Sequence, residues 1–480
     1  MSSSTISRKE TRKVKDILRL CKSLIRKAPS PGSWIRKRAE LDCVGFQTGV
    51  GTSGSWNQRD EEGCNASLFH GIALECMGDC LGPSLLLQRA AAEASPREVV
   101  GAFSSLEKQL REKLSTGFPK VHPKYVCEVV SLLLPSLEGK VIENEEAVSI
   151  IRSCGWIAYP KEQTARCLCF IIPLVCGLKG DRLETEKIKS VLWALAWIAA
   201  KEGLLEENLR VQLQTVIFEL FDVFVGRDST GSQISFVMWS VGTFAGFRFI
   251  KEPDVRFGEK VVMLISRFLK ESIPKMEKKE WAQQVNSVIW GLGLFSKEGL
   301  LEKGTSQDLS CLRRYMGILV AKFLEAEFVA EHLDTVTLGV RWFARSGLVQ
   351  GEEEKKDFVK SVLCPLTVVL EKLEEKSKLE CALNIGSSLG SFKDVIPNLL
   401  GERLILQKVI DCLLPFVSME EQVMEKAPDV KGCLQHFVSD PTLKSFLGER
   451  VGEVETFIER WSSYQGPASR QKRVKRRATL

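Results

Sequence analysis

The chain has 480 residues, of which 44% are hydrophobic, 27% charged and 8% aromatic, and 67 Lys and Arg against 61 Asp and Glu give a formal charge of +6. This composition is typical of a soluble globular protein. The longest apolar run, residues 167–178, contains Pro173 and is shorter than the about 20 residues that cross a bilayer, which excludes a transmembrane segment of ordinary length.

The first segment, residues 1–40, carries twelve Lys and Arg and three acidic residues, a net charge of +9. Val14, Leu18 and Cys21 recur at helical spacing among cationic residues, which predicts a basic amphipathic helix. Three roles stay open for it: docking on the rest of the chain, a targeting segment, or a contact with a membrane or with RNA. The acidic residues within it count against the targeting role.

Residues 41–66 are rich in Gly, Ser, Asn and Gln, which predicts a linker. Within it, residues 49–54 read Gly-Val-Gly-Thr-Ser-Gly, the G-x-G-x-x-G pattern of dinucleotide-binding loops. Such a loop needs a buried strand before it and a helix at its last glycine, whereas polar Gln47 and Thr48 precede this one. We therefore expect a flexible loop here and no cofactor.

Residues 67–140 are predicted to form an N-terminal helical cap. One short stretch around its start contains residue types that bind zinc, namely Cys64, His70, Cys76 and Cys80. Their spacing matches no zinc motif, and the surrounding apolar residues indicate a packed helix, so no metal site is predicted. The chain has 4 histidines, and none stands in a catalytic motif. No catalytic site is predicted either.

Residues 141–420 contain an internal repeat that is marked by tryptophan. Residues 190–196 and 287–293 read Ser-Val-Leu-Trp-Ala-Leu-Ala and Ser-Val-Ile-Trp-Gly-Leu-Gly, and both are followed shortly afterwards by Lys-Glu-Gly-Leu-Leu-Glu. Five tryptophans share this context: Trp156, Trp193, Trp239, Trp290 and Trp342. Their successive separations of 37, 46, 51 and 52 residues are typical of two-helix repeats.

A second amphipathic helix is predicted after four of these tryptophan helices, at residues 209–225, 255–270, 309–324 and 356–373, and a weaker pair at 379–417. The predicted fold class is therefore all-α, an α-solenoid of about six helix-turn-helix repeats. Small residues one and three places after Trp193, Trp239 and Trp290 would let neighbouring helices approach closely while the indole fills the space between layers. The five tryptophans are thus predicted core residues.

The tryptophan helix resembles the "LWALAKLG" core of octotricopeptide repeats and the related repeats of RAP-domain and FAST-kinase-like RNA proteins, most closely in residues 273–293. The resemblance covers roughly residues 145–395 and implies an α-solenoid that binds single-stranded RNA. The spacings of 46 to 52 residues exceed the usual repeat of that family, and no C-terminal RAP-like domain follows. No base-contacting residues and no nuclease are carried over.

The charge of the chain is concentrated at its ends. Residues 470–480 carry +6, and since the two ends together exceed the total, residues 41–469 carry −9. Because phosphate neutralisation supplies much RNA affinity, this balance counts against RNA unless a basic strip is segregated on one face. Cations in or beside the repeat helices form either that strip or ordinary solvated faces: Arg210, Arg248, Lys251, Arg256, Arg313, Arg314, Arg341 and Arg345.

Residues 421–464 are predicted to form a C-terminal helical cap, and residues 465–480 a disordered basic tail. The candidate nucleic-acid-binding residues are the cations of this tail: Arg470, Lys472, Arg473, Lys475, Arg476 and Arg477. The same cluster also fits a nuclear-import signal or a solubilising end.

The predicted function is non-catalytic binding of single-stranded RNA, in transcript stabilisation, processing or translation, by a monomer without cofactors. The alternative is a protein-interaction scaffold or a secreted effector of an intracellular bacterium, which an acidic or apolar surface would favour. The 15 cysteines are scattered and mostly lie in apolar runs such as residues 167–172, which favours a reducing intracellular compartment. The basic ends are compatible with an organelle matrix or the nucleus.

Overall fold

A computed structural model describes residues 95–463, apart from residues 104–132, 157–160, 200–206, 251–255, 396–402 and 419–426 and a few single positions. The predicted basic helix, the linker, most of the N-terminal cap and the basic tail lie outside the described residues. All regular secondary structure in the described part is helical, as predicted. None of these described helices is long and apolar enough to span a membrane. The chain divides into two compact units, residues 1–228 and 229–480.

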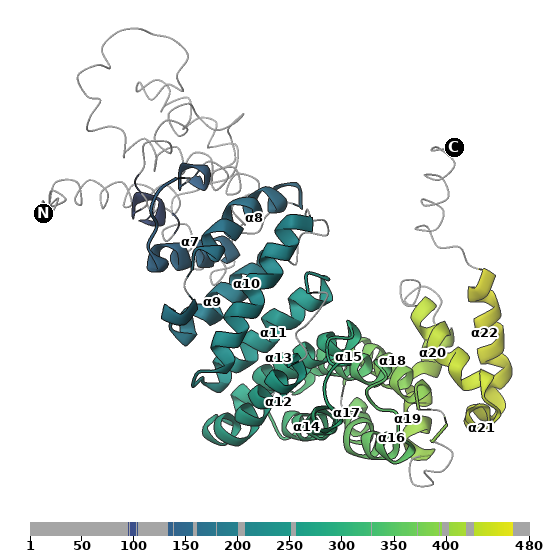
Figure 1. The fold of residues 1–480 in the computed structure, drawn as a ribbon. Helices are drawn as coiled ribbons and strands as arrows, with labels where there is room; N and C mark the ends of the chain where they lie inside the picture. Colours follow the sequence, from purple (N-terminus) through teal and green to yellow (C-terminus); the bar gives the residue numbers. More distant parts are fainter. Residues whose placement is uncertain are drawn as a thin grey trace, which may run out of the picture. The chain divides into compact units, whose positions relative to one another are not determined.

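In its described part, the first unit has four α-helices that form two pairs, labelled α7 to α10 in Figure 1. These are α7 (Asn144–Trp156) with α8 (Lys161–Cys176), and α9 (Thr185–Ala199) with α10 (Glu207–Val225). Helix α7 packs against α9 and α8 packs against α10, so equivalent helices of the two pairs lie side by side. Leu192 and Leu195 of α9 and Phe221 of α10 are fully or almost fully buried between them.

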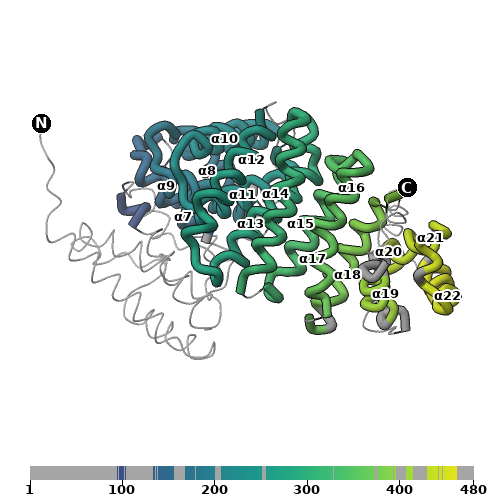
Figure 2. Tube along the Cα trace, turned by 90° about the horizontal axis from the view of Figure 1, so that it is seen from below, coloured from purple at the N-terminus to yellow at the C-terminus, as the bar shows by residue number. Residues whose placement is uncertain are grey.

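The second unit has two layers of helices, and the chain alternates between them (Figure 2). Each helix of the first layer packs against the next one: α11 (Gly231–Gly246), α13 (Lys278–Lys297), α15 (Leu333–Arg345), α18 (Glu375–Gly390) and α20 (Ala427–Ser439). The second layer is built in the same way from α12 (Phe257–Arg267), α14 (Ser306–Leu324), α17 (Cys364–Leu370) and α19 (Arg403–Ser418). After the short α21 (Pro441–Lys444), α22 (Val451–Ser463) packs on both α19 and α20.

The predicted second helices of the repeats are confirmed with small shifts at their ends. Helices α10 and α14 coincide with the predictions for residues 209–225 and 309–324. The other two predicted helices are interrupted by a π-helical turn each, η3 (Phe268–Ser272) after α12 and η6 (Val359–Leu363) between α16 (Glu352–Phe358) and α17. Such a turn inserts one residue and rotates the faces on either side of it, which a regular helical period cannot anticipate.

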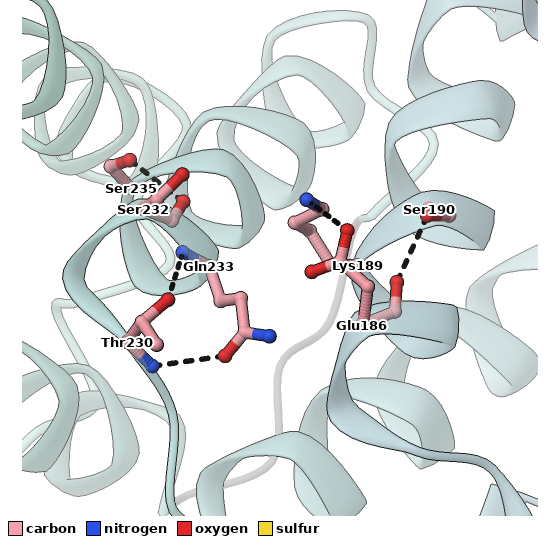
Figure 3. A network of polar contacts seen from close by, with 7 residues as sticks. All are labelled: Glu186, Lys189, Ser190, Thr230, Ser232, Gln233 and Ser235. Atoms are coloured by element: carbon pink, nitrogen blue, oxygen red, sulfur yellow. Dashed lines mark hydrogen bonds and ion pairs between the residues drawn. The ribbon is translucent and has the colours of Figure 1, made fainter.

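Polar caps fix where several of these helices begin. At the start of α11 the Thr230 hydroxyl accepts a hydrogen bond from the Gln233 N–H, while the Gln233 side chain accepts one of 2.9 Å from the Thr230 N–H (Figure 3). Thr305 and Asp308 form the same reciprocal pair before α14. Each box satisfies two backbone donors that the helix leaves unpaired. In the first unit, Ser190 of α9 donates to the Glu186 carbonyl one turn earlier (Figure 3).

Phenylalanine fills the space between the layers of the second unit. Phe257 of α12 meets Phe295 of α13 edge-on, with ring centroids 5.1 Å apart, and Phe343 of α15 stacks on Phe358 of α16 at 5.8 Å. All four rings are at most 2% exposed. Phenylalanine therefore contributes most of the fully buried aromatic rings in the described part of this unit.

The cysteines follow the prediction only in part. Cys154, Cys381, Cys412 and Cys433 are buried, and burial raises the pKa of the Cys381 and Cys433 thiols to about 12. These thiols stay protonated and pack as small apolar groups. Cys169, in the apolar run that predicted burial, is exposed instead, because it lies on the outer side of α8 between buried Leu168 and Ile171.

Candidate functional site

In the described part of the second unit, α11, α13 and α15 each have one side whose residues are half-buried or exposed, called here the uncovered side. On α13 this side carries Gln283, Asn286, Trp290 and Lys297, which follow one another at three to seven residues and are half-buried or exposed. Asn286 and Trp290 are one turn apart. The uncovered side of α13 thus combines an indole with amide groups before it and a cationic group after it.

In the second unit the repeat tryptophans lie on this uncovered side, so the prediction that they are core residues is wrong in that none of those described is fully buried. Trp239, Trp290 and Trp342 in the second unit, and Trp193 in the first, are half-buried. The residues immediately before Trp193, Trp239 and Trp290 take the buried places: Leu192, Met238 and Ile289 are 0% exposed. Trp156 ends α7, and its side chain lies outside the described residues.

The small residues beside the tryptophans explain this placement. A Cβ atom added to Gly291 would lie 2.3 Å from the Met238 carbonyl oxygen, and one added to Gly293 would lie 2.5 Å from the Gly339 carbonyl oxygen. The backbones of α11, α13 and α15 therefore touch, as the prediction of close helix approach requires. Helices at this distance leave no space for an indole between them. The rings are displaced to the uncovered side.

In α15 the tryptophan is not at the position, relative to the glycine that contacts the neighbouring helix, that it has in α13. Gly339 packs against Ile289 of α13 as Gly291 packs against Met238 of α11. Trp342 follows this contact glycine by three residues, whereas Trp290 precedes its own by one. Trp342 is consequently one helical turn further along its helix.

Because of this offset, Trp342 meets Trp290 across the two helices. The ring centroids are 4.8 Å apart and the planes are inclined at 57°. The ammonium group of Lys297, at the end of α13, lies 5.2 Å from the centre of the Trp342 ring, within range of a cation–π contact. We call Trp239, Trp290 and Trp342 the tryptophan face.

Three neighbouring first-layer helices end in a cation, which we call the basic rim: Arg248 after α11, Lys297 of α13 and Arg345 of α15. The Arg248 side chain is 80% exposed and that of Lys297 is 43% exposed. Glu298 lies between these two, with its carboxylate 3.6 Å from Arg248 Nε and 3.2 Å from Lys297 Nζ. The rim is therefore basic but partly neutralised.

Two amide oxygens without hydrogen-bond partners lie on α13, the helix that carries Trp290. In the described part of the chain, only two buried side-chain nitrogen or oxygen atoms have no hydrogen-bond partner, Gln284 Oε1 and Asn286 Oδ1. Both belong to α13. A buried polar atom without a partner is destabilising, so such atoms are common where a ligand supplies the missing bond.

The other predicted cations serve different purposes. Arg313 of α14 donates a hydrogen bond of 2.8 Å to the Leu348 carbonyl and pairs with Glu354, so it ties α14 to α16 and to the loop before α16. Arg341 of α15 lies 3.3 Å from Asn384 Oδ1 of α18, and Arg345 of the basic rim also reaches α18, 3.5 Å from Ser387 Oγ. Arg210 pairs with Glu207 on α10. The sequence analysis did not select Lys297. Its position seven residues after the repeat tryptophan Trp290 could have indicated it.

Several predicted sites lie outside the residues that the structure describes. The basic tail with Arg470, Lys472, Arg473, Lys475, Arg476 and Arg477 is outside the described residues, as are Lys251, the glycine loop at 49–54 and the stretch from Cys64 to Cys80. Among the residues that are described, no group of three or more His, Cys, Asp or Glu side chains has the geometry of a metal site.

A comparison with solved structures finds similarity to a protein described as a circular tandem repeat protein with novel repeat topology and enhanced subunit contact surfaces. It is 13% identical, the match covers 84% of this chain and 96% of that one, and the TM-score is 0.27. No family model and no curated protein matches the chain. The chain is a helical tandem-repeat protein by the packing of its own helices.

Proposed function

We propose that the second unit binds single-stranded RNA across the tryptophan face without catalysing a reaction. The observation that carries the proposal is the contact between the half-buried Trp290 and Trp342, with the Lys297 ammonium over the second ring. Proteins that bind single strands combine aromatic rings on which bases stack with cations that follow the backbone.

The surrounding groups support the same ligand. The basic rim supplies three cations at one end of neighbouring helices, at the place where phosphates would pass. The half-buried Asn286 supplies an amide beside the indoles, and amides form hydrogen bonds with the Watson–Crick edges of unstacked bases. The resemblance of the repeat to RNA-binding solenoids points the same way, and a role in transcript stabilisation, processing or translation would follow from it.

Binding of labelled single-stranded RNA to the full chain, followed by fluorescence anisotropy, tests the proposal. We expect binding at low salt that weakens between about 50 and 200 mM salt, with a slope of about −0.7 per phosphate contacted. Ultraviolet crosslinking should place adducts in α13 and α15. Absence of binding at low salt, or binding that salt does not change, would contradict the proposal.

A protein partner is the second candidate, and exposed phenylalanines favour it. Phe236 and Phe247 of the α11 region are 36% and 47% exposed and could anchor an apolar side chain. Crosslinks that join this surface to protein, in a chain that binds no RNA, would favour this function.

The basic tail gives a separate prediction. We expect deletion of residues 470–480 to weaken RNA binding and to reduce the salt slope, because six cations are removed. The thermal unfolding temperature should not change, and titrations of the deleted and full chains at several salt concentrations measure both effects. Equal affinities would show that the tail is no RNA-clamping arm, while the role of the tryptophan face would stand.

A further inference from the structure

Arg248 has a backbone conformation that side chains with a Cβ rarely adopt. Its φ is +61°, and it is the single residue other than glycine with a positive φ in the described part of the chain. It follows α11 at the place where the helix ends. The Arg248 N–H donates 2.8 Å to Ala245 and the Phe249 N–H donates 3.0 Å to Phe244, the hydrogen-bond pattern of a Schellman cap.

The next repeat forms the same cap with glycine. After α13, the Gly299 N–H donates 3.1 Å to Ser296 and the Leu300 N–H donates 2.9 Å to Phe295, with φ +73° at Gly299. Gly299 follows Trp290 by nine residues, as Arg248 follows Trp239. In α11 an arginine thus occupies the position for which glycine is the favoured residue.

The arginine side chain does not compensate through packing. It is 80% exposed, and its guanidinium is 3.6 Å from Glu298, whose carboxylate also faces Lys297 at 3.2 Å. An exposed ion pair of this kind adds little stability. The cap needs the positive φ but not the arginine, and residues other than glycine in such strained conformations are concentrated at functional sites.

We propose that Arg248 and Lys297 form a binding site for one phosphate group of the RNA backbone. In the free protein, Glu298 is the partner of both cations. The proposal rests on the RNA-binding function above and assigns to it a particular anion site. Phosphate replaces Glu298 as the partner of the two cations, and Lys297 places that phosphate next to the Trp342 ring. Glu298 keeps the two cations together in the free protein and competes with the ligand.

The test compares Arg248→Asn and Arg248→Gly with the wild-type full chain, because asparagine and glycine both accept a positive φ. For labelled single-stranded RNA we expect the dissociation constant to rise about three- to tenfold and the salt slope to become shallower by about 0.7. The thermal unfolding temperature of Arg248→Gly should rise by about 1 to 4 °C, which excludes unfolding as the cause. Glu298→Gln should bind RNA more tightly.

The matched control is Arg314→Gln, which removes an exposed cation from α14 in the second layer. If Arg248→Asn changes the affinity and the salt slope no more than this control does, the phosphate site is wrong although RNA binding by the tryptophan face stands. If the wild-type chain binds no RNA at low salt, both proposals fail. If Glu298→Gln weakens binding, the competing role of Glu298 is wrong.

Discussion

Replacement of Gly291 by alanine should lower the free energy of unfolding by about 3 kcal/mol, the upper end of what excess bulk in a packed interface costs. The added Cβ would lie 2.3 Å from the Met238 carbonyl oxygen and 2.8 Å from its carbonyl carbon. These are backbone atoms, which cannot rotate away, so α11 and α13 must separate. Thermal unfolding should measure the effect as a decrease of roughly 6 to 12 °C.

Gly432 in the middle of α20 provides the matched control. A Cβ atom added there meets nothing within 4 Å. Alanine is favoured over glycine in a helix interior, so Gly432→Ala should stabilise the protein by about 0.5 to 1 kcal/mol. If Gly291→Ala were stabilising to the same extent, the close approach of α11 and α13 would be wrong, and with it the reason for the exposure of the indoles.

The double substitution Trp290→Ala/Trp342→Ala should weaken binding of single-stranded RNA by about 100-fold, since each stacked base contributes about 1 to 3 kcal/mol. The two rings are only half-buried and their centroids are 4.8 Å apart, so stability should decrease by only about 1 to 2 kcal/mol. This is less than the about 3 to 5 kcal/mol that burial in the core would give. Anisotropy titrations and thermal unfolding measure the two quantities separately.

Two further variants separate stacking from structure. Trp290→Phe keeps an aromatic ring and should retain most of the affinity. Trp281→Ala, at the start of the same helix, removes a ring that is 8% exposed and donates a 3.2 Å hydrogen bond to the Met276 carbonyl. It should destabilise the protein strongly while the folded fraction still binds RNA. Equal affinities of the double variant and the wild type would contradict stacking on the tryptophan face.

The helical repeat could be predicted from the sequence because two of its signals are local. Apolar residues at helical spacing located α10 and α14 closely, and the Trp-Gly-Leu-Gly pattern of residues 290–293 indicated the close approach of neighbouring helices. Both signals depend on the period of one helix and on the size of a side chain, which the sequence shows directly.

The direction of the tryptophans could not be predicted in the same way. A large apolar residue within an apolar helix indicates burial, and the first layer is apolar on several sides. The direction of each ring depends on how near the next helix comes, and that follows from glycines on two helices about fifty residues apart, Gly291 and Gly339. The offset of Trp342 by one turn depends on the same pairing.

The basic rim was only partly visible in the sequence for a related reason. Arg248 and Arg345 were recognised as cations near the repeat helices, but their positions gave no reason to prefer them over Arg313, which ties α14 to the following loop and helix. The positive φ of Arg248 could have been suspected from the glycine nine residues after Trp290.

The contacts between first-layer helices have a consequence for how such a surface can change. Gly242, Gly291, Gly293 and Gly339 bring backbone against backbone, so the distance between neighbouring helices does not depend on the outward side chains. Substitutions at Asn286 or Trp239 would alter what each helix offers to a ligand and leave that spacing intact. Descendants of this chain could therefore acquire new binding preferences through single substitutions, one helix at a time, while the spacing of the helices stays the same.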